Sequence, residues 1–222
     1  MYKVSDAFKE AMKKPVQRFR LRGTITIGAR SIGFDENNII SGTFGISNQS
    51  SGSDAVEIGT VYTAELDGTF TGLSLPRYSL KDRKITPSLE LLTSEGWEAV
   101  PLGVFYINEA NWTKWGVEIT AYDAMSKLDK ALLLSSSQGT IYDFLNLAAK
   151  ACGVELAQTK TEIQELPNGS NQLAIYEDND IETWRDLVSW CAQTAGAFAT
   201  INREGKLELR QYTQTVVDTI DD

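Results

Sequence analysis

The sequence contains no histidine in 222 residues and only two cysteines. Without histidine there is no imidazole base for a Ser-His-Asp or Cys-His nucleophilic centre, and no HExxH metal site. Two cysteines without histidine do not supply the ligands of a typical structural zinc site. No GxxxxGK[ST] loop is present and no GxGxxG follows a strand pattern, so phosphate-cradling loops are missing as well. These gaps exclude the commonest nucleophilic, zinc-dependent and nucleotide-binding enzymes, and we expect no catalytic set, no cofactor and no metal.

Carboxylate pairs are the remaining catalytic option, because some glycosidases work with two acidic side chains and no histidine. Glu109, Glu118 and Asp123, near the ends of predicted strands, are the candidates here. With 30 Asp and Glu residues in the chain such neighbours arise by chance, and we interpret these three as surface carboxylates. The acidic cluster 177–182 resembles half of a calcium loop but lacks the required Gly and the final Glu. Because Asp and Asn cap helices, this cluster favours a helix start at 178–180 over a metal site.

Long apolar runs are also missing. No stretch approaches the roughly 20 residues that span a bilayer. The first fifteen residues, MYKVSDAFKEAMKKP, lack the apolar centre and the cleavage site of a secretory signal. We therefore expect synthesis in the cytoplasm and no membrane association. Cys152 and Cys191 each fall on the apolar side of a predicted helix, which favours two buried thiols; a disulfide between those helices is the alternative.

The net charge of −9 is unevenly distributed along the chain. Residues 1–30 carry eight Lys and Arg against Asp6 and Glu10, a net charge of +6, so the other 192 residues carry −15. A basic start on an acidic body suits nucleic-acid binding, or an assembly in which one subunit's positive end meets the negative face of the next. Because the acidic body would repel DNA phosphates, we favour assembly and expect no nucleic-acid partner.

Alternating strand patterns dominate the first part of the sequence. A short helix comes first, capped by Ser5 or Asp6 and ended by Pro15. Strands are then predicted at 16–27, 39–47, 56–66, 85–93, 100–108 and 117–122, with turns at 94–96 and 111–116. Six strands within about 105 residues indicate a closed or nearly closed antiparallel barrel, or a sandwich.

The pattern changes after the last of these strands. A short helix at 123–131 precedes a helix at whose start Thr140 and Asp143 have capping-box spacing, with Gly153 behind its last turn. Another helix runs to Gly196, and strands 197–201 and 206–212 form a hairpin around the turn 202–205. The chain is thus α+β and mainly β, with a helix and β-barrel domain at 1–130 and a small α/β domain of two helices and a hairpin at 131–222. The tail 216–222 has no cap and no obvious partner, so we expect either the front portion of a longer polypeptide or a chain cut at a domain edge.

Two groups of residues are candidates for an assembly interface. Arg18, Arg20 and Arg22 share one face of the first predicted strand, opposite its apolar face, which favours a solvated strand face, with a subunit contact as the alternative. The turn 111–116 carries Trp112 and Trp115. These rings suit packing in the core or against a subunit, contact with another protein, or stacking on a sugar ring.

Several segments, taken in order, resemble a known family. They are SDAFKEA at 5–11, PLGVFYI at 101–107, ITAYDAMSKLD at 119–129, TWRDL at 183–187, GAFA at 196–199 and GKLEL at 205–209. The set is similar to the N-terminal part of phage and prophage tail-hub proteins, the baseplate hub or tail-associated proteins of siphophages. The resemblance runs over nearly the whole chain.

This resemblance implies a β-barrel related to the tail-tube fold, followed by a small α/β domain. It also implies a trimeric ring in the virion tail, with the distal tail, tail tube and tape-measure proteins as partners. Lytic activity in that family lies in C-terminal domains, and nothing here matches one. We therefore expect a non-catalytic structural component of a tail tip or baseplate hub. A carbohydrate-binding module for host cell-wall glycans is the alternative, and a carboxylate-based hydrolase is a more distant one.

Overall fold

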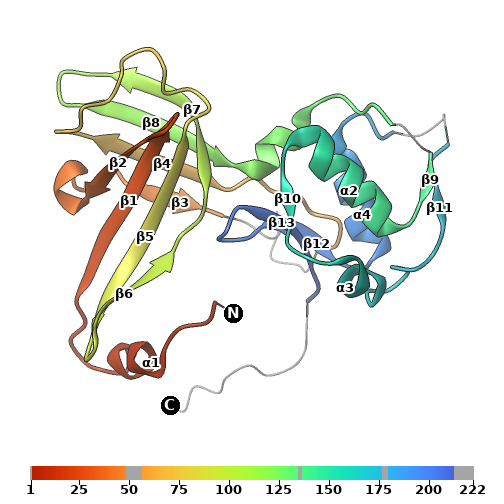
Figure 1. Cartoon of the computed structure of the whole chain (residues 1–222), viewed down its shortest axis with the longest axis horizontal. Helices are drawn as coiled ribbons and strands as arrows, with labels where there is room; N and C mark the ends of the chain where they lie inside the picture. Colours follow the sequence, from red (N-terminus) through yellow and green to blue (C-terminus); the bar gives the residue numbers. More distant parts are fainter. Residues whose placement is uncertain (1, 49–56, 135–136, 177–179, 213–222) are drawn as a thin grey trace. The chain divides into compact units, whose positions relative to one another are not determined.

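The computed structural model describes residues 2–48, 57–134, 137–176 and 180–212 (Figure 1). The chain divides into two compact units. Unit 1 comprises Met1–Asn48, Thr63–Ser126 and Ile201–Lys206, and unit 2 comprises Gln49–Tyr62, Lys127–Thr200 and Leu207–Asp222. In the described part of the chain, no helix has both the length and the apolar character needed to cross a bilayer.

Unit 1 is built around one antiparallel sheet. Its elements are α1 (Asp6–Met12), β1 (Phe19–Ile27), β2 (Arg30–Asp35), the 3-10 turn η1 (Glu36–Asn38), β3 (Gly45–Ser47), β4 (Glu65–Phe70), β5 (Lys84–Thr93), β6 (Gly96–Pro101), β7 (Phe105–Trp112) and β8 (Val117–Asp123). The sheet has eight strands in the order β2-β1-β5-β7-β8-β4-β3, with β6 paired to β5 beside this path. The main path is antiparallel throughout, which confirms the mainly β character predicted for this part of the chain.

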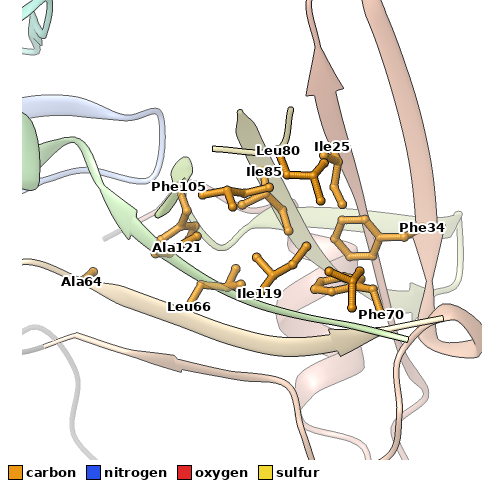
Figure 2. Packing of buried hydrophobic residues seen from close by; sticks show 12 residues of the cluster. Ile25, Phe34, Ala64, Leu66, Phe70, Leu80, Ile85, Phe105, Ile119 and Ala121 are labelled. Atoms are coloured by element: carbon orange, nitrogen blue, oxygen red, sulfur yellow. The ribbon is translucent and has the colours of Figure 1, made fainter. Parts of the chain in front are cut away.

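Alternation along each strand separates an inner apolar face from an outer polar face. The inner face forms a buried cluster of Ile25, Phe34, Ala64, Leu66, Phe70, Leu80, Ile85, Phe105, Ile107, Val117, Ile119 and Ala121. Phe34 on β2 meets Phe70 on β4 edge to face, with 5.1 Å between the ring centroids. Figure 2 shows these two rings together beside Ile25 and Ile119. Since β2 and β4 are far apart in the strand order, this contact requires the sheet to curl around the cluster.

The curl does not close the sheet among the described residues. The strand order ends at β2 on one side and at β3 on the other, and no pairing joins these two strands in the described ranges. A fully closed barrel, one of the alternatives predicted from the sequence, is therefore not formed there, and the structure is an open, strongly curled sheet. Gly23 on β1 lets the ring of Phe34, its partner on β2, lie close against the strand, because a Cβ at this position would be 2.3 Å from Cζ of Phe34.

Unit 2 combines helices with two small sheets. Its elements are α2 (Ile141–Cys152), α3 (Lys160–Gln164), α4 (Trp184–Thr194), β9 (Gln138–Gly139), β10 (Glu155–Leu156), β11 (Leu173–Ala174), β12 (Phe198–Ile201) and β13 (Lys206–Arg210). The 3-10 turn η2 (Ala124–Asp129) connects β8 to this unit. The sheets have the orders β10-β13-β12 and β11-β9, and Phe144 of α2 meets Trp190 of α4 at 6.0 Å between ring centroids.

Several predicted elements are confirmed. Ser5 caps α1, and Thr140 and Asp143 form the capping box of α2, which ends at Gly153 in the left-handed region with φ 65°. The hairpin β12–β13 encloses the turn 202–205. The predicted helix at 123–131 is instead the 3-10 turn η2.

Other boundaries were wrong for identifiable reasons. The strand predicted at 100–108 is two strands, β6 and β7, interrupted around Gly103, whose φ of 148° breaks the ladder. In place of a strand at 56–66, β4 begins at Glu65, and Gly59 and Thr60 instead bond to the backbone of residues 197 and 199 in unit 2. The strand predicted at 39–47 forms at its two ends, as a single antiparallel bridge from Ile39 to Phe70 and as β3, and it is interrupted by a turn at Gly42 with φ 79°. The second helix begins at Trp184 rather than at 178–180, since Thr183 and Asp186 form its capping box.

Candidate assembly surface

The three predicted interface arginines lie at the start of β1. Arg20 and Arg22 belong to the outer face of the sheet, across from Glu90 and Ser88 of β5. The carbonyl of Arg18 accepts the backbone N–H of Leu92, so the ladder continues one residue before the strand and Arg18 follows the same alternation. We call these three residues the basic strand.

Only part of the positive charge on the basic strand is left for a partner. The Arg20 guanidinium forms an ion pair with Glu90 and lies over the Trp97 ring at 4.1 Å from its centroid. Both groups of that ion pair are largely buried, with exposed fractions of 24% and 15%. Arg22 is half exposed, with its Nε 3.8 Å from the same carboxylate, and Arg18 is exposed. Arg20 thus joins β1, β5 and β6 together, while Arg18 and Arg22 face solvent.

Helix α1 is attached to β6 near this strand. The Ser5 hydroxyl accepts the N–H of Phe8 to cap the helix and also donates to the Glu98 carboxylate. The Ser5 backbone N–H donates to the same carboxylate at 2.9 Å. These two hydrogen bonds, of which the one from the hydroxyl has the larger effect, hold the pKa of Glu98 below its usual range because they favour its charged form. The N-terminal segment is thereby held on unit 1.

The two candidate tryptophans lie at the tip of the β7–β8 hairpin. Trp112 ends β7 with an exposed fraction of 37%, and Trp115 lies in the turn with 67% exposed. The Lys114 ammonium is 4.7 Å from the centroid of the Trp115 ring. Neither ring belongs to the buried cluster of unit 1, so the tip presents aromatic surface to solvent.

The three candidate carboxylates do not converge on one point. Asp123 is buried and accepts the N–H of Met125 at 3.0 Å, which caps the turn η2. Glu109 and Glu118 are exposed on the outer face of β7 and β8, opposite to the inner face that carries the cluster. Their position agrees with the interpretation of surface carboxylates, whereas Asp123 is a buried cap.

The pairing of β4 with β8 places two more carboxylates, Glu65 and Asp67, near Glu109 and Glu118. On β4, Glu65 pairs with Tyr122 and Asp67 pairs with Thr120, and on β7 Glu109 also pairs with Thr120. The Thr120 hydroxyl donates to Asp67 at 2.7 Å. We call Glu65, Asp67, Glu109 and Glu118 the acidic face.

The acidic face affects the ionisation of Tyr122, which lies among its carboxylates. The pKa of Tyr122 is raised, first by burial and then by the negative charges of Glu65, Glu109 and Asp67, since all of these disfavour the phenolate. The fields of three carboxylates therefore reach one phenol group. Sequence reasoning found Glu109 and Glu118 but missed Glu65 and Asp67, because only the pairing of β4 with β8 brings them there.

Two of the hollows in the described residues lie on unit 1. One, of about 400 Å³, is lined mainly by apolar residues such as Phe44, Ile46 and Phe105, together with Asp123 and Arg203. The other, of about 460 Å³, is an open depression along the outer face beside Arg22 and Asp35. Each lining contains a single carboxylate, whereas a glycosidase needs two facing one substrate.

The remaining candidates lie in unit 2. Cys152 and Cys191 are both buried free thiols, as predicted, and they form no disulfide. Burial raises the pKa of both thiols. Of the cluster 177–182, residues 177–179 lie outside the described ranges, and the N–H of Glu182 bonds to the Asp186 carboxylate at 3.2 Å. Within the described residues, no group of three or more His, Cys, Asp or Glu is placed to hold a metal ion.

No protein-family model and no curated protein sequence matches the chain. Among solved structures, the fold is similar to the crystal structure of the 43 kDa tail protein of prophage MuSo2 from Shewanella oneidensis. The TM-score is 0.55 and the identity is 14%, over 89% of this chain and 57% of that chain. This chain therefore spans little more than half the length of that tail protein, and the likeness is one of fold. A chain of the virion of a native gene transfer agent particle matches with a TM-score of 0.37 and 11% identity, over 59% of this chain and 48% of that chain.

Proposed function

We propose that this chain is a non-catalytic structural component of a phage or prophage tail, placed at the tail tip or baseplate hub. The observation that carries the proposal is the fold likeness to a prophage tail protein over 89% of the chain. The ordered sequence segments that resemble tail-hub proteins support it from a separate direction. The protein would be made in the host cytoplasm and incorporated into the virion tail.

The partners proposed for such a component are further copies of itself, as a trimer in the intact protein, and the distal tail, tail tube and tape-measure proteins. Two features of unit 1 suit an assembly role. Exposed aromatic rings stand at the tip of the β7–β8 hairpin, and aromatic residues and Arg are enriched at protein interfaces. The basic strand on β1 and the acidic face on β4, β7 and β8 also occupy different strands of the outer face.

The position of the acidic side chains favours a non-catalytic role over a carboxylate-based hydrolase. Glu109 and Glu118 line neither of the two hollows, and Asp123 is engaged in capping a turn. Carbohydrate binding would rely on Trp112 and Trp115, which also lie outside both hollow linings. Sugar-binding rings need a surface shaped around the sugar, so assembly remains the better proposal.

A stop codon in the gene for this chain, placed in the phage or prophage that carries it, tests the proposal. We expect particles without complete tails in negative-stain electron micrographs, and loss of infectivity. Expression of the intact gene in trans should restore both, which excludes an effect on neighbouring genes. Normal tails and full infectivity in the mutant would contradict the proposal.

A further inference from the structure

We propose that the acidic face of one copy of this chain binds the basic strand of a second copy, in a head-to-tail contact. The inference rests on the proposed function, because it gives that assembly role a specific pair of surfaces. It assigns one occupant to the acidic face: Arg18 and Arg22 of a neighbouring copy.

The acidic face lacks charge compensation within its own chain. Its four carboxylates lie on three adjacent strands, and Asp67 and Glu109 flank Thr120 from opposite sides. None of the four forms an ion pair with a Lys or Arg of the described residues. Lys84 lies on β5, the strand next to β7, where it is opposite Tyr106, and it forms no ion pair with any of the four carboxylates. Glu118 is diagonal to Glu109 across β7–β8 and to Asp67 across β4–β8, a separation that long side chains can bridge, so a cationic partner would relieve the repulsion between these carboxylates.

The basic strand has the complementary property. Arg20 is neutralised by Glu90, but Arg18 forms no ion pair in the described part of the chain and Arg22 only approaches the shared Glu90 carboxylate. Arg18, Arg20 and Arg22 are successive residues of one strand face, about 6.6 Å apart. Glu65 and Asp67 on β4 have the same spacing, because they too are two residues apart on one face. Arg18 and Arg22, the two arginines left for a partner, are four residues apart, or about 13 Å, which is twice the spacing of Glu65 and Asp67. The two surfaces are therefore opposite in charge, and each free arginine can approach a different carboxylate of the acidic face.

Neutralisation within one copy is prevented by the fold. In the sheet, β1 is two strand spacings from β7, the nearest strand of the acidic face, and three from β8, which is about 10 Å and about 14 Å at 4.8 Å per step. Both distances exceed the screening length of about 8 Å at physiological salt. Both groups also lie on the outer face of a curled sheet, where side chains on separate strands diverge. A contact between two different surfaces of identical subunits is heterologous, and such contacts build rings or filaments.

Charge reversal on each surface tests the inference with the full-length chain. The acidic-face variant is Glu109→Lys/Glu118→Lys, since both side chains are exposed and free of structural hydrogen bonds among those found. The basic-strand variant is Arg18→Glu/Arg22→Glu. A matched control, Glu165→Lys/Glu204→Lys, makes the same charge change as the acidic-face variant at exposed positions that belong to neither surface. Circular dichroism melting curves establish that every variant is folded.

Sedimentation velocity then measures self-association. The wild type should associate, and more weakly as NaCl is raised, because added salt shortens the screening length. Each variant alone should associate at least about tenfold more weakly, since both would bring like charges together. An equimolar mixture of the two variants should regain association, and so should a single chain carrying all four substitutions, because both restore opposite charges at each contact. The control should behave as the wild type.

The inference is overturned if the wild type stays monomeric at low salt, if either variant associates as tightly as the wild type, or if neither the mixture nor the fourfold variant recovers. Binding of the acidic face to the distal tail protein in place of a second copy would also overturn it. These results leave the proposed function standing if the stop-codon mutant still lacks tails. If self-association fails these tests and the stop-codon mutant also has normal tails, both the inference and the proposed function are contradicted.

Discussion

The strand pair β1–β2 depends on Gly23, and Gly23→Ala tests the curled packing of unit 1. A Cβ at this position would lie 2.3 Å from Cζ and 2.7 Å from Cε1 of Phe34, and 2.8 Å from the carbonyl oxygen of Thr86. The Phe34 ring is 4% exposed and meets Phe70 across the core, so it has little room to withdraw. The Thr86 oxygen belongs to the backbone of β5 and moves only with the strand.

The expected cost follows from these distances. Overpacking a core by a methyl group destabilises by about 1–3 kcal/mol. Contact with both a buried ring and a backbone oxygen places Gly23→Ala near the upper end, at about 2–3 kcal/mol. Alanine lowers the conformational entropy of the unfolded chain relative to glycine, which offsets about 0.4–1 kcal/mol of this destabilisation. A net loss of about 2 kcal/mol is therefore expected.

Urea unfolding followed by circular dichroism measures the change, and hydrogen exchange of the β1 and β2 amides assigns it to unit 1. Gly33→Ala on β2 is the matched control, because the nearest atom to its added Cβ is 4.0 Å away, and we expect a change within about 0.5 kcal/mol. In a Phe34→Leu background, which removes Cζ and Cε1, Gly23→Ala should cost at least about 1 kcal/mol less. Equal costs for the two glycine substitutions, or strict additivity with Phe34→Leu, would refute the packing described here.

Three further predictions concern other parts of the chain. The pKa of Asp143 is lowered mainly by a hydrogen bond from the Thr140 backbone N–H and next by one from the Thr140 hydroxyl. The ionised Asp143 therefore stabilises the fold above the pKa of about 3.9 that it has in the unfolded chain, and this stabilisation is lost as the pH falls through its lower pKa in the folded state. Asp143→Asn should cost about 1 kcal/mol at pH 7 in urea unfolding, and its difference from the wild type should vanish at low pH; a constant difference would contradict the capping role. Arg20→Ala should lower the free energy of unfolding by about 1 kcal/mol, because it removes the ion pair with Glu90 and the contact with the Trp97 ring. A double-mutant cycle with Glu90→Ala that shows no coupling energy would contradict the ion pair. Cys152 and Cys191 should react with a thiol reagent only after denaturation, when two thiols per chain appear; fast reaction in the native state would mean that they are not buried.

Local chemistry made several elements predictable from the sequence. The alternation of β1, the capping box of α2 and the Gly-ended turn of the β12–β13 hairpin each involve residues within a few positions of one another, and all were found. Helix α3 was missed although Thr159 and Glu162 form a capping box before it, which is a readable signal. Strand β2 was missed because only Ile32 and Phe34 of its residues are apolar, and Phe34 finds its partner Phe70 through the curl of the sheet.

The candidate surfaces were predictable only in part for the same reason. The three arginines share a face by simple alternation, so the sequence was sufficient to group them. Glu90 and Trp97, which engage Arg20, are about seventy residues away along the chain and carry no signal that links them to it. The acidic face likewise joins residues of β4 to residues of β7 and β8, and depends on register that no local pattern encodes.

Purified particles give the most direct test of a structural role in the tail. Tails from the phage or prophage that encodes this chain can be separated from free protein on a density gradient and decorated with gold-labelled antibody against the chain. The account predicts that the chain sediments with the tails and that gold collects at the tail tip, in a fixed number of copies per particle by quantitative mass spectrometry. A chain found only in the soluble fraction, with unlabelled tails, would contradict it.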